Sequence, residues 1–229
     1  MKFSHIGKKR ELFPLAEIKK WEELIMAINL QKGQKIDLTK GGGAGLRQVM
    51  VGLGWDEAQK SGGFLGLFKQ TQDIDCDASA IVCGEDGRLL NPSNIKDCVV
   101  YYGNLRHPSG AIVHQGDNLT GAGDGDDEQI MVNLAQLPQN VGKIVFVVNI
   151  YDARTRGQHF GLIKNAFIRL VDMSNNSEIC RFNLSENYNN MTGLVVGEIY
   201  KKNGEWKFNA IGQPVQEASR LDALLQLYK

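Results

Sequence analysis

The chain has 229 residues, and 42% of them are hydrophobic, a composition that supports a folded core and excludes global disorder. Its 26 basic and 26 acidic side chains give a formal net charge of zero, which argues against a general binder of nucleic acid or of anionic membranes. No apolar run approaches the roughly 20 residues that span a bilayer, and the start lacks the apolar segment of a secretory signal.

The first predicted element is an amphipathic helix over residues 15–28, which we treat as part of an N-terminal extension, residues 1–28. From residue 31 onward the pattern changes to short apolar runs separated by turn residues, with Asp-Gly and Asn-Gly steps that favour tight turns. The predicted strands cover residues 36–38, 46–55, 78–83, 98–102, 111–114, 130–134, 143–151, 166–171, 178–184, 194–201 and 205–210.

Many short strands with a turn about every ten residues predict an all-β fold, a two-sheet β-sandwich, rather than alternating βαβ units. The sandwich is expected over residues 29–213, and the helical spacing of the tail adds a C-terminal helix within residues 214–229. The nearly continuous apolar run at 143–151 predicts a central strand that is covered on both faces. The glycine-rich apolar run at 61–68 is either a loop folded over a sheet or an exposed patch used for docking.

The four cysteines have neither a CxxC pair nor the spacing of a zinc site. Because no export signal is present, we interpret them as reduced, mostly buried thiols of a cytoplasmic protein.

Acidic side chains cluster in the segment GDNLTGAGDGDDEQI, residues 116–130, although charge is balanced over the whole chain. Its glycines let the backbone turn tightly and bring the carboxylates together. Carboxylates about 5 Å apart repel by roughly 3 kcal/mol per pair at an effective dielectric constant near 20. A hard divalent cation relieves this repulsion, and it requires converging oxygen ligands of this kind.

An EF-hand loop of matching length does not fit this segment. Leu119 and Gly121 stand where side-chain ligands are expected, Ala122 replaces the required glycine, and the flanks are predicted strands rather than helices. The segment is therefore either a calcium-type loop on a β scaffold or a solvated acidic turn.

A second acidic segment, DIDCDAS at residues 73–79, places Asp73, Asp75 and Asp77 on one face of a predicted strand. Like charges on one face are unfavourable in a sheet unless a positive charge lies over them. If the fold joins the two segments, their excess of negative charge favours two divalent ions over one. Ca²⁺ is favoured over Mg²⁺, because a flexible glycine loop tolerates irregular coordination of high number.

The motifs resemble those of the TerD family of tellurium-resistance and bacterial stress proteins. The matching pieces include VGLGWDE, DIDCDAS, VHQGDNLTGAGDGDDEQI, KIVFVVNIYDA and RGQHFGLIKNAFIRLVD, within a resemblance that covers roughly residues 28–213. The segments 1–28 and 61–68 lie outside it, so a partner carried over from relatives without them is in doubt.

The resemblance implies a β-sandwich that binds two calcium ions and has no established catalytic activity. It implies a regulatory or scaffold module in stress or tellurite resistance, located in the cytoplasm or at the inner face of the membrane. It also implies protein partners, among them a TerC-like membrane protein, and a slime-mould relative is associated with cyclic AMP. The ligands that it implies here are Asp75, Asp77, Asp117, Asn118, Asp124, Asp126, Asp127 and Glu128.

Two further acids stand beside this set. Asp73 is an extra upstream acid that departs from the commoner family pattern, and Asp152 either completes a site or caps a turn.

Two rival functions stay open at this stage. One is a divalent-metal phosphoester hydrolase with His114 as general base, against which His114 is a strand residue that faces solvent or forms hydrogen bonds. The other is a nucleotide or oxyanion sensor. Its candidate anion site would combine Arg154, Arg156, Lys164 and Arg169, unless these side chains form salt bridges to the acidic segments instead.

Overall fold

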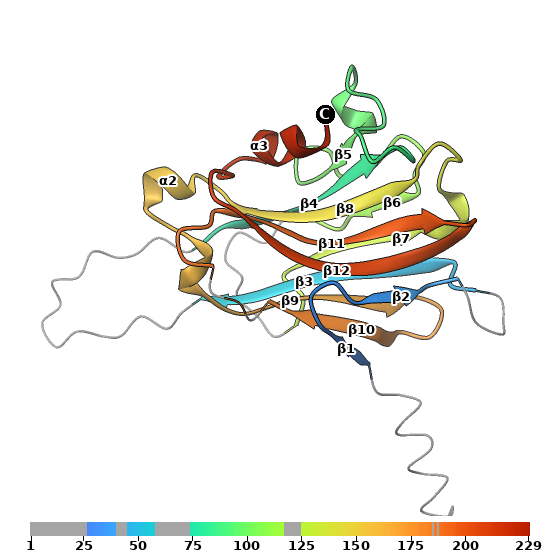
Figure 1. The fold of residues 1–229 in the computed structure, drawn as a ribbon, viewed down its shortest axis with the longest axis horizontal. Helices are drawn as coiled ribbons and strands as arrows, with labels where there is room; N and C mark the ends of the chain where they lie inside the picture. Colours follow the sequence, from blue (N-terminus) through green and yellow to red (C-terminus); the bar gives the residue numbers. More distant parts are fainter. Residues whose placement is uncertain (1–26, 40–44, 58–73, 117–124, 185, 187) are drawn as a thin grey trace, which may run out of the picture.

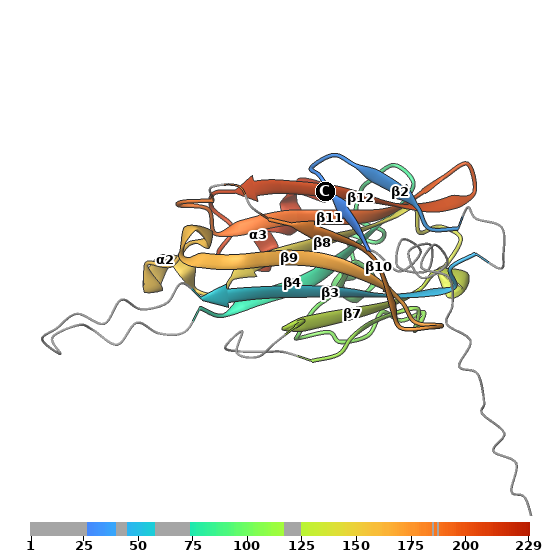
Figure 2. The same cartoon turned by 90° about the horizontal axis from the view of Figure 1, so that it is seen from below.

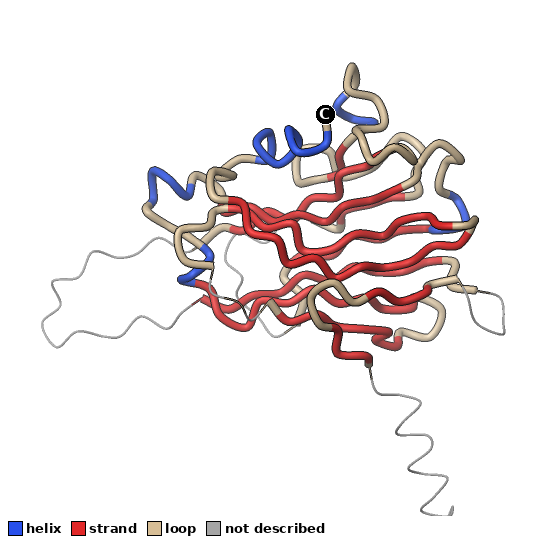
Figure 3. The backbone as a smooth tube through the Cα atoms, in the orientation of Figure 1, coloured by secondary structure: helices blue, strands red, loops and turns tan. Residues whose placement is uncertain are grey.

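The computed structural model describes residues 27–39, 45–57, 74–116, 125–184, 186 and 188–229. Strands dominate this part of the chain, and helices are confined to short segments (Figure 3). They form two sheets of six strands each, so the predicted all-β sandwich is confirmed. Strands of both sheets run in the same general direction (Figures 1 and 2), as in aligned sheet packing.

The first sheet contains, in spatial order, β1 (Ile28–Leu30), β10 (Ser177–Asn183), β9 (Ile163–Asp172), β3 (Gln48–Glu57), β7 (Glu128–Asn133) and β6 (Ile112–His114). The second sheet contains β2 (Lys35–Asp37), β12 (Glu205–Val215), β11 (Gly193–Lys202), β8 (Lys143–Ile150), β4 (Cys76–Cys83) and β5 (Val99–Val100). The helices are α2 (Ala153–Arg156), α3 (Leu221–Leu225) and the 3-10 turns η1 (Ile95–Asp97), η2 (Leu134–Gln136), η3 (Phe160–Leu162) and η4 (Gln226–Tyr228).

Antiparallel pairing dominates both sheets, and the predicted strands match the observed ones to within a few residues. The Asn203–Gly204 hairpin forms as predicted. Both residues have positive φ, 55° and 79°, which is the conformation that a two-residue turn between twisted strands requires.

The predicted N-terminal helix was expected to extend to Ile28, and this boundary is wrong because Ile28 begins a strand. Residues 1–26 lie outside the described part, but Ile28–Leu30 form strand β1, which pairs in parallel with Cys180–Phe182 of β10. Ladder hydrogen bonds to an existing strand satisfy this backbone, so tertiary pairing overrides the helical spacing of the side chains. The predicted apolar segment 61–68 also lies outside the described residues.

Strand β8 is covered on both faces, as predicted. Phe146 points into the core between the sheets, whereas Val145 and Val147 point to the outer face, where the C-terminal helix α3 packs on them through Leu224 and Leu225. Figure 1 shows α3 lying beside β4 and β8, with the C-terminus close to β5. The two apolar faces of this one strand therefore explain why its sequence lacks polar alternation.

The remaining core predictions hold as well. All four cysteines are buried free thiols, and Trp55 and Trp206 lie in the core between the sheets. Within the described residues, no helix is both long and apolar enough to cross a membrane.

Candidate functional site

The two acidic segments meet at one end of the sandwich, around the buried thiol of Cys76 at the start of β4. Burial raises the pKa of Cys76 well above its usual range. Four carboxylates add to this effect, and they belong to Asp77, Glu128, Asp75 and Asp127. The two segments also meet directly, because the backbone N–H of Ala78 donates to Glu128 Oε2 across 50 positions of sequence.

Alternation along β4 divides its side chains between two environments. Cys76 and Ala78 face the core between the sheets, whereas Asp77 and Ser79 face the outer side of the second sheet. Asp77 is nevertheless 94% buried, with only 6% of its surface exposed. Its Oδ2 accepts a hydrogen bond from Asn149 Nδ2 (3.1 Å), the residue directly opposite on β8.

Glu128 connects the two sheets from the inside. It begins β7, whose side chains alternate between buried and half-buried, and its own side chain lies on the buried face with Ile130. Its Oε2 accepts a hydrogen bond from the backbone N–H of Ala78 in β4. This charge-assisted bond holds the end of the acidic loop against the strand that carries the second acidic segment.

His114 lies beside Glu128 inside the sandwich. Its Nε2 is 3.6 Å from Glu128 Oε2, its Nδ1 accepts a hydrogen bond from Gly116 N–H (3.2 Å), and only 2% of the residue is exposed. His114 is therefore buried and hydrogen-bonded rather than facing solvent. This is one of the two alternatives to a general base that the sequence left open.

Asp127 is held by the neighbouring strand β3. Its Oδ2 accepts a hydrogen bond from Trp55 N–H (2.7 Å), and its own N–H donates to the carbonyl of Leu53 (2.8 Å). Burial raises the pKa of Asp127, the bond from Trp55 offsets part of that rise, and the charges of Asp56 and Asp126 add to it. The carboxylate thus lies where negative charge is unfavourable and a cation would be stabilising.

Asp126 turns away from this group, to the outer face of the first sheet. Arg169 in β9 binds both of its oxygens, Nε to Oδ1 at 2.7 Å and Nη2 to Oδ2 at 2.9 Å. The carboxylate lies over Gly52 of β3, where a β-carbon would overlap with it. Asp126 therefore has a cation supplied by the protein itself, and hydrogen bonds to Asp126 raise the pKa of Arg169.

The other members of the candidate anion site do not join Arg169 here. Arg156 lies over the ring of Tyr151, with its guanidinium carbon 5.2 Å from the ring centroid. Arg154 and Lys164 are exposed to solvent. For Arg169, the salt bridge to the acidic segment is the alternative that the structure supports.

Asp152 precedes α2 in the left-handed conformation (φ 50°), with an exposed side chain that does not cap the helix. The preceding residue, Tyr151, donates its N–H to the carbonyl of Asp75 (2.8 Å). The backbone of Asp152 is therefore one residue away from a direct contact with the second acidic segment. The carbonyl of Asp152 accepts the N–H of Arg156 (3.1 Å).

The remaining predicted ligands, Asp73, Asp117, Asn118 and Asp124, lie outside the described residues. Among the residues that are described, no three His, Cys, Asp or Glu side chains are grouped closely enough to hold a metal ion by themselves. The described part therefore joins the two acidic segments through Glu128 and β4 without forming such a group of three.

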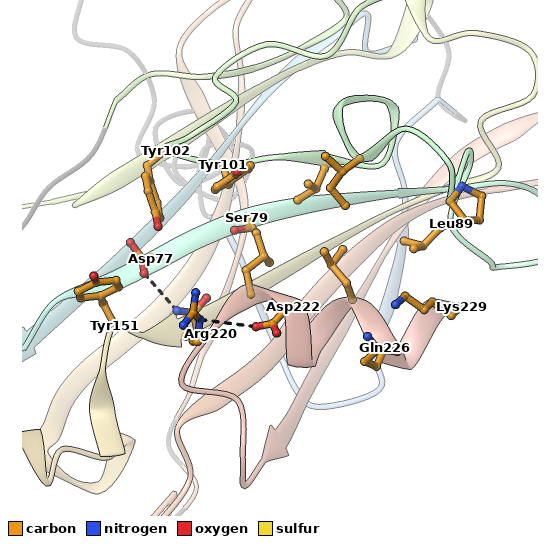
Figure 4. Close-up of a pocket in the computed structure, with 16 residues that line it drawn as sticks. Asp77, Ser79, Leu89, Tyr101, Tyr102, Tyr151, Arg220, Asp222, Gln226 and Lys229 are labelled. Carbon is orange, nitrogen blue, oxygen red and sulfur yellow. Dashed lines mark hydrogen bonds and ion pairs between the residues drawn. The ribbon is translucent and has the colours of Figure 1, made fainter. Parts of the chain in front are cut away.

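The sequence interpretation did not single out two buried polar residues beside Asp77, namely Ser79 and Asn149. Both side chains are at least 98% buried and line a pocket on the outer face of the second sheet (Figure 4). The signal was available: Asn149 interrupts an apolar run that is otherwise unbroken, and Ser79 shares the strand face of Asp77.

Two packed six-stranded sheets, with the acidic segments joined between β4 and β7, make this an acidic β-sandwich protein. The TerD domain family matches residues 26–228, and the chain belongs to this family.

The similarity extends to curated proteins. Over 205 residues the chain is 49% identical to "Stress response protein SCP2" of Bacillus subtilis (strain 168), covering 89% of this chain and 100% of that protein. It is 42% identical over 188 residues to "Tellurium resistance protein TerD" of Serratia marcescens, covering 82% and 91% of the two chains.

A solved structure supports the fold. The crystal structure of a homologue of telluride resistance protein (TerD) from Streptomyces coelicolor A3(2) superimposes with a TM-score of 0.56 at 20% identity. It covers 76% of this chain and 92% of that one.

Proposed function

We propose that this protein is a non-enzymatic, calcium-dependent module of stress or tellurite resistance that acts by regulation or as a scaffold. One observation carries the proposal: the backbone N–H of Ala78 in β4 donates to Glu128 Oε2 of β7, so the two acidic segments meet although they belong to different sheets. Loss of calcium would then leave several carboxylates close together without compensation.

The donor chemistry fits the ion. Ca²⁺ takes six to eight oxygen ligands in irregular geometry, and carboxylates are its commonest charged ligands. Asp75, Asp77, Asp127 and Glu128 are the candidates within the described residues. The hydrogen bond from Trp55 occupies one lone pair of Asp127 and leaves others for a cation. When bound, calcium would supply the positive charge that offsets these neighbouring carboxylates.

The chain's own residues divide the work in this proposal. Glu128 and Asp127 anchor the end of the acidic loop to β4 and β3 through backbone N–H groups. Asp126 serves as an ionic anchor on the outer face, because Arg169 uses both of its oxygens. Asp117, Asn118, Asp124 and Asp73 would provide the further ligands, and two ions are proposed in all. The ordered acidic end would then recognise a protein partner, with a TerC-like membrane protein as the proposed candidate.

The names of the relatives support the physiological setting. The similar proteins are named for stress response and tellurium resistance, and none of the names cited above describes an enzyme. We therefore infer a role in resistance that depends on binding rather than on turnover.

Thermal unfolding with added Ca²⁺, Mg²⁺ or EGTA tests the metal assignment. An ion that binds only the folded state adds about 2.7 kcal/mol at one hundred times its Kd. For a domain of this size that corresponds to a rise in Tm of roughly 5–11 °C. Mg²⁺ should give a smaller rise, because it demands near-octahedral geometry.

Asp75→Asn combined with Asp127→Asn should abolish most of the calcium response. Asp86→Asn is the matched control, because Asp86 is an exposed acid beyond the opposite end of β4 and accepts only the local N–H of Arg88. An unchanged calcium response in the double variant would refute the assignment. Hydrolysis of a generic phosphodiester that stops on His114→Ala would instead favour the hydrolase.

A further inference from the structure

A pocket of about 490 Å³ opens on the outer face of the second sheet, between β4, β8, the segment that contains β5, and helix α3. Figure 4 shows its polar floor and aromatic walls. The floor consists of Asp77, Ser79 and Asn149, and each of these residues is at least 94% buried. No part of the calcium proposal explains why Ser79 and Asn149 are polar at this depth.

The hydrogen-bond orientation of Asn149 makes this floor rich in acceptors. Its Nδ2 donates to the Asp77 carboxylate (3.1 Å), which fixes the amide, because a flipped amide would place two acceptor oxygens together. Asn149 Oδ1 and Ser79 Oγ are buried and have no hydrogen-bond partner among the residues that the structure describes. Buried polar atoms of this kind cost about 1–3 kcal/mol each when unsatisfied, so the floor favours a ligand that donates hydrogen bonds.

The walls favour a cation on an apolar body. Tyr101, Tyr102 and Tyr151 line the pocket, and Figure 4 shows Asp77 between Tyr102 and Tyr151. Tyr102 and Tyr151 are each 45% exposed, and Ile95 at the same pocket is 48% exposed, which is unusual for large apolar side chains gathered in one place. Tyrosine faces attract ammonium and guanidinium groups, as the stacking of Arg156 on Tyr151 illustrates within the chain.

The charges of the lining agree with a cationic ligand. Asp77 is the buried charge of the pocket, whereas Arg220 and Asp222 lie 3.9 Å apart with 84% and 77% of their side chains exposed. These two opposite charges offset each other in solvent, and Lys229 is also exposed. The Asp77 charge at the floor is screened much less than the exposed charges around it.

We propose that this pocket binds a small organic ammonium compound, a primary amine on an apolar chain. The ammonium group donates to Asp77, Asn149 Oδ1 and Ser79 Oγ, and the chain lies along the tyrosines and the apolar wall that includes Ile95. A carbohydrate would need donors as well as acceptors from the floor, and these three side chains offer as free donors only the Ser79 hydroxyl and the second N–H of the Asn149 amide. The amine shares Asp77 with the proposed calcium site and would compete with Ca²⁺ there, so its binding is measured in the absence of calcium.

Isothermal titration of the full chain in EGTA tests this proposal with a matched pair of probes. Hexane-1,6-diamine should bind saturably, whereas hexane-1,6-diol, which has the same chain without charge, should not. Asn149→Leu should weaken diamine binding about tenfold to hundredfold through loss of an acceptor to a charged donor. Tyr102→Ala should weaken it roughly threefold to thirtyfold through loss of an exposed ring face.

Asn209→Leu is the control, because Asn209 donates to Glu198 across the same sheet (3.0 Å) but does not line the pocket. It should bind the diamine like the parent. If Asn149→Leu fails to fold, Tyr102→Ala decides the question, since its side chain is half-exposed. Equal binding of the diol, or undiminished diamine binding by Tyr102→Ala, would overturn the proposal.

Discussion

The ion pair between Arg169 and Asp126 gives the sharpest prediction about stability. We expect Arg169→Met to destabilise the protein in EGTA by about 3 kcal/mol. Removing one partner of a buried ion pair costs roughly 3–5 kcal/mol, and the Asp126 carboxylate would keep the neutral Gln129 amide (3.2 Å) but lose its cation. The Asp126 side chain is 0% exposed and Arg169 is 26% exposed, which places the cost at the lower end of that range. The corresponding fall in Tm is roughly 6–12 °C for a domain of this size.

Asp126→Asn should cost less, about 1–2 kcal/mol. Arg169 then keeps its bond to Glu178 (3.0 Å) and is exposed enough to be partly hydrated. A double-mutant cycle should therefore show coupling of at least about 1 kcal/mol between the two positions. Urea unfolding monitored by fluorescence of the buried tryptophans measures all three variants.

Arg181→Met is the matched control for this experiment. Arg181 also binds Glu178 on the same face (2.9 Å) and has a similar exposure of 28%, but it makes no bond to Asp126. It should cost less than about 1 kcal/mol, as partly exposed pairs do. If Arg169→Met and Arg181→Met proved equally mild, the buried pair would not be a structural anchor. If Asp126→Asn lost the calcium response, we would conclude that Asp126 is a calcium ligand rather than an anchor for Arg169.

Two further predictions concern the backbone under Asp126 and the pH dependence. Gly52→Ala should lower Tm in EGTA about as much as Arg169→Met, because the added β-carbon would displace the Asp126 carboxylate. Gly84→Ala is the control and should change Tm little, because its added β-carbon would meet only the flexible Asp86 carboxylate at 3.1 Å. A similar small effect at both glycines would contradict this. Burial lowers the pKa of His107 from its usual 6.5, although the carbonyl of Asp97 offsets part of the shift. The unfolded chain then binds a proton that the folded one does not, so stability should fall as pH drops below about 6.5. His107→Gln should flatten that dependence between pH 7 and 5.5 in chemical unfolding, and an unaltered slope would count against the burial argument.

The fold class could be predicted from the pattern of apolar residues along the chain. Alternating and continuous apolar runs predicted the strands, including the doubly covered β8, because the period of the side chains reports which faces are buried. Asn203–Gly204 fixed a hairpin, since only a few residue types accept positive φ. The acidic motifs also predicted that two remote segments would meet, and the bond from Ala78 N–H to Glu128 joins them, while the metal ligands stay a prediction.

The partners of the neighbouring acids, in contrast, depend on contacts between strands that are distant in the sequence. Asp126, Asp127 and Glu128 are consecutive in the sequence but have different partners. Asp126 pairs with Arg169 on the outer face of the first sheet, and Asp127 accepts a bond from Trp55 N–H. Glu128 reaches across the interior to the backbone of β4. Local sequence cannot encode that division, because it depends on which strand lies next to each side chain, and those strands are distant in the chain. The same reason applies to Ile28, which fits a helical spacing in the sequence but pairs as a strand with Cys180. It also applies to Asn149, which lies opposite Asp77 only because β4 and β8 are neighbours in the sheet.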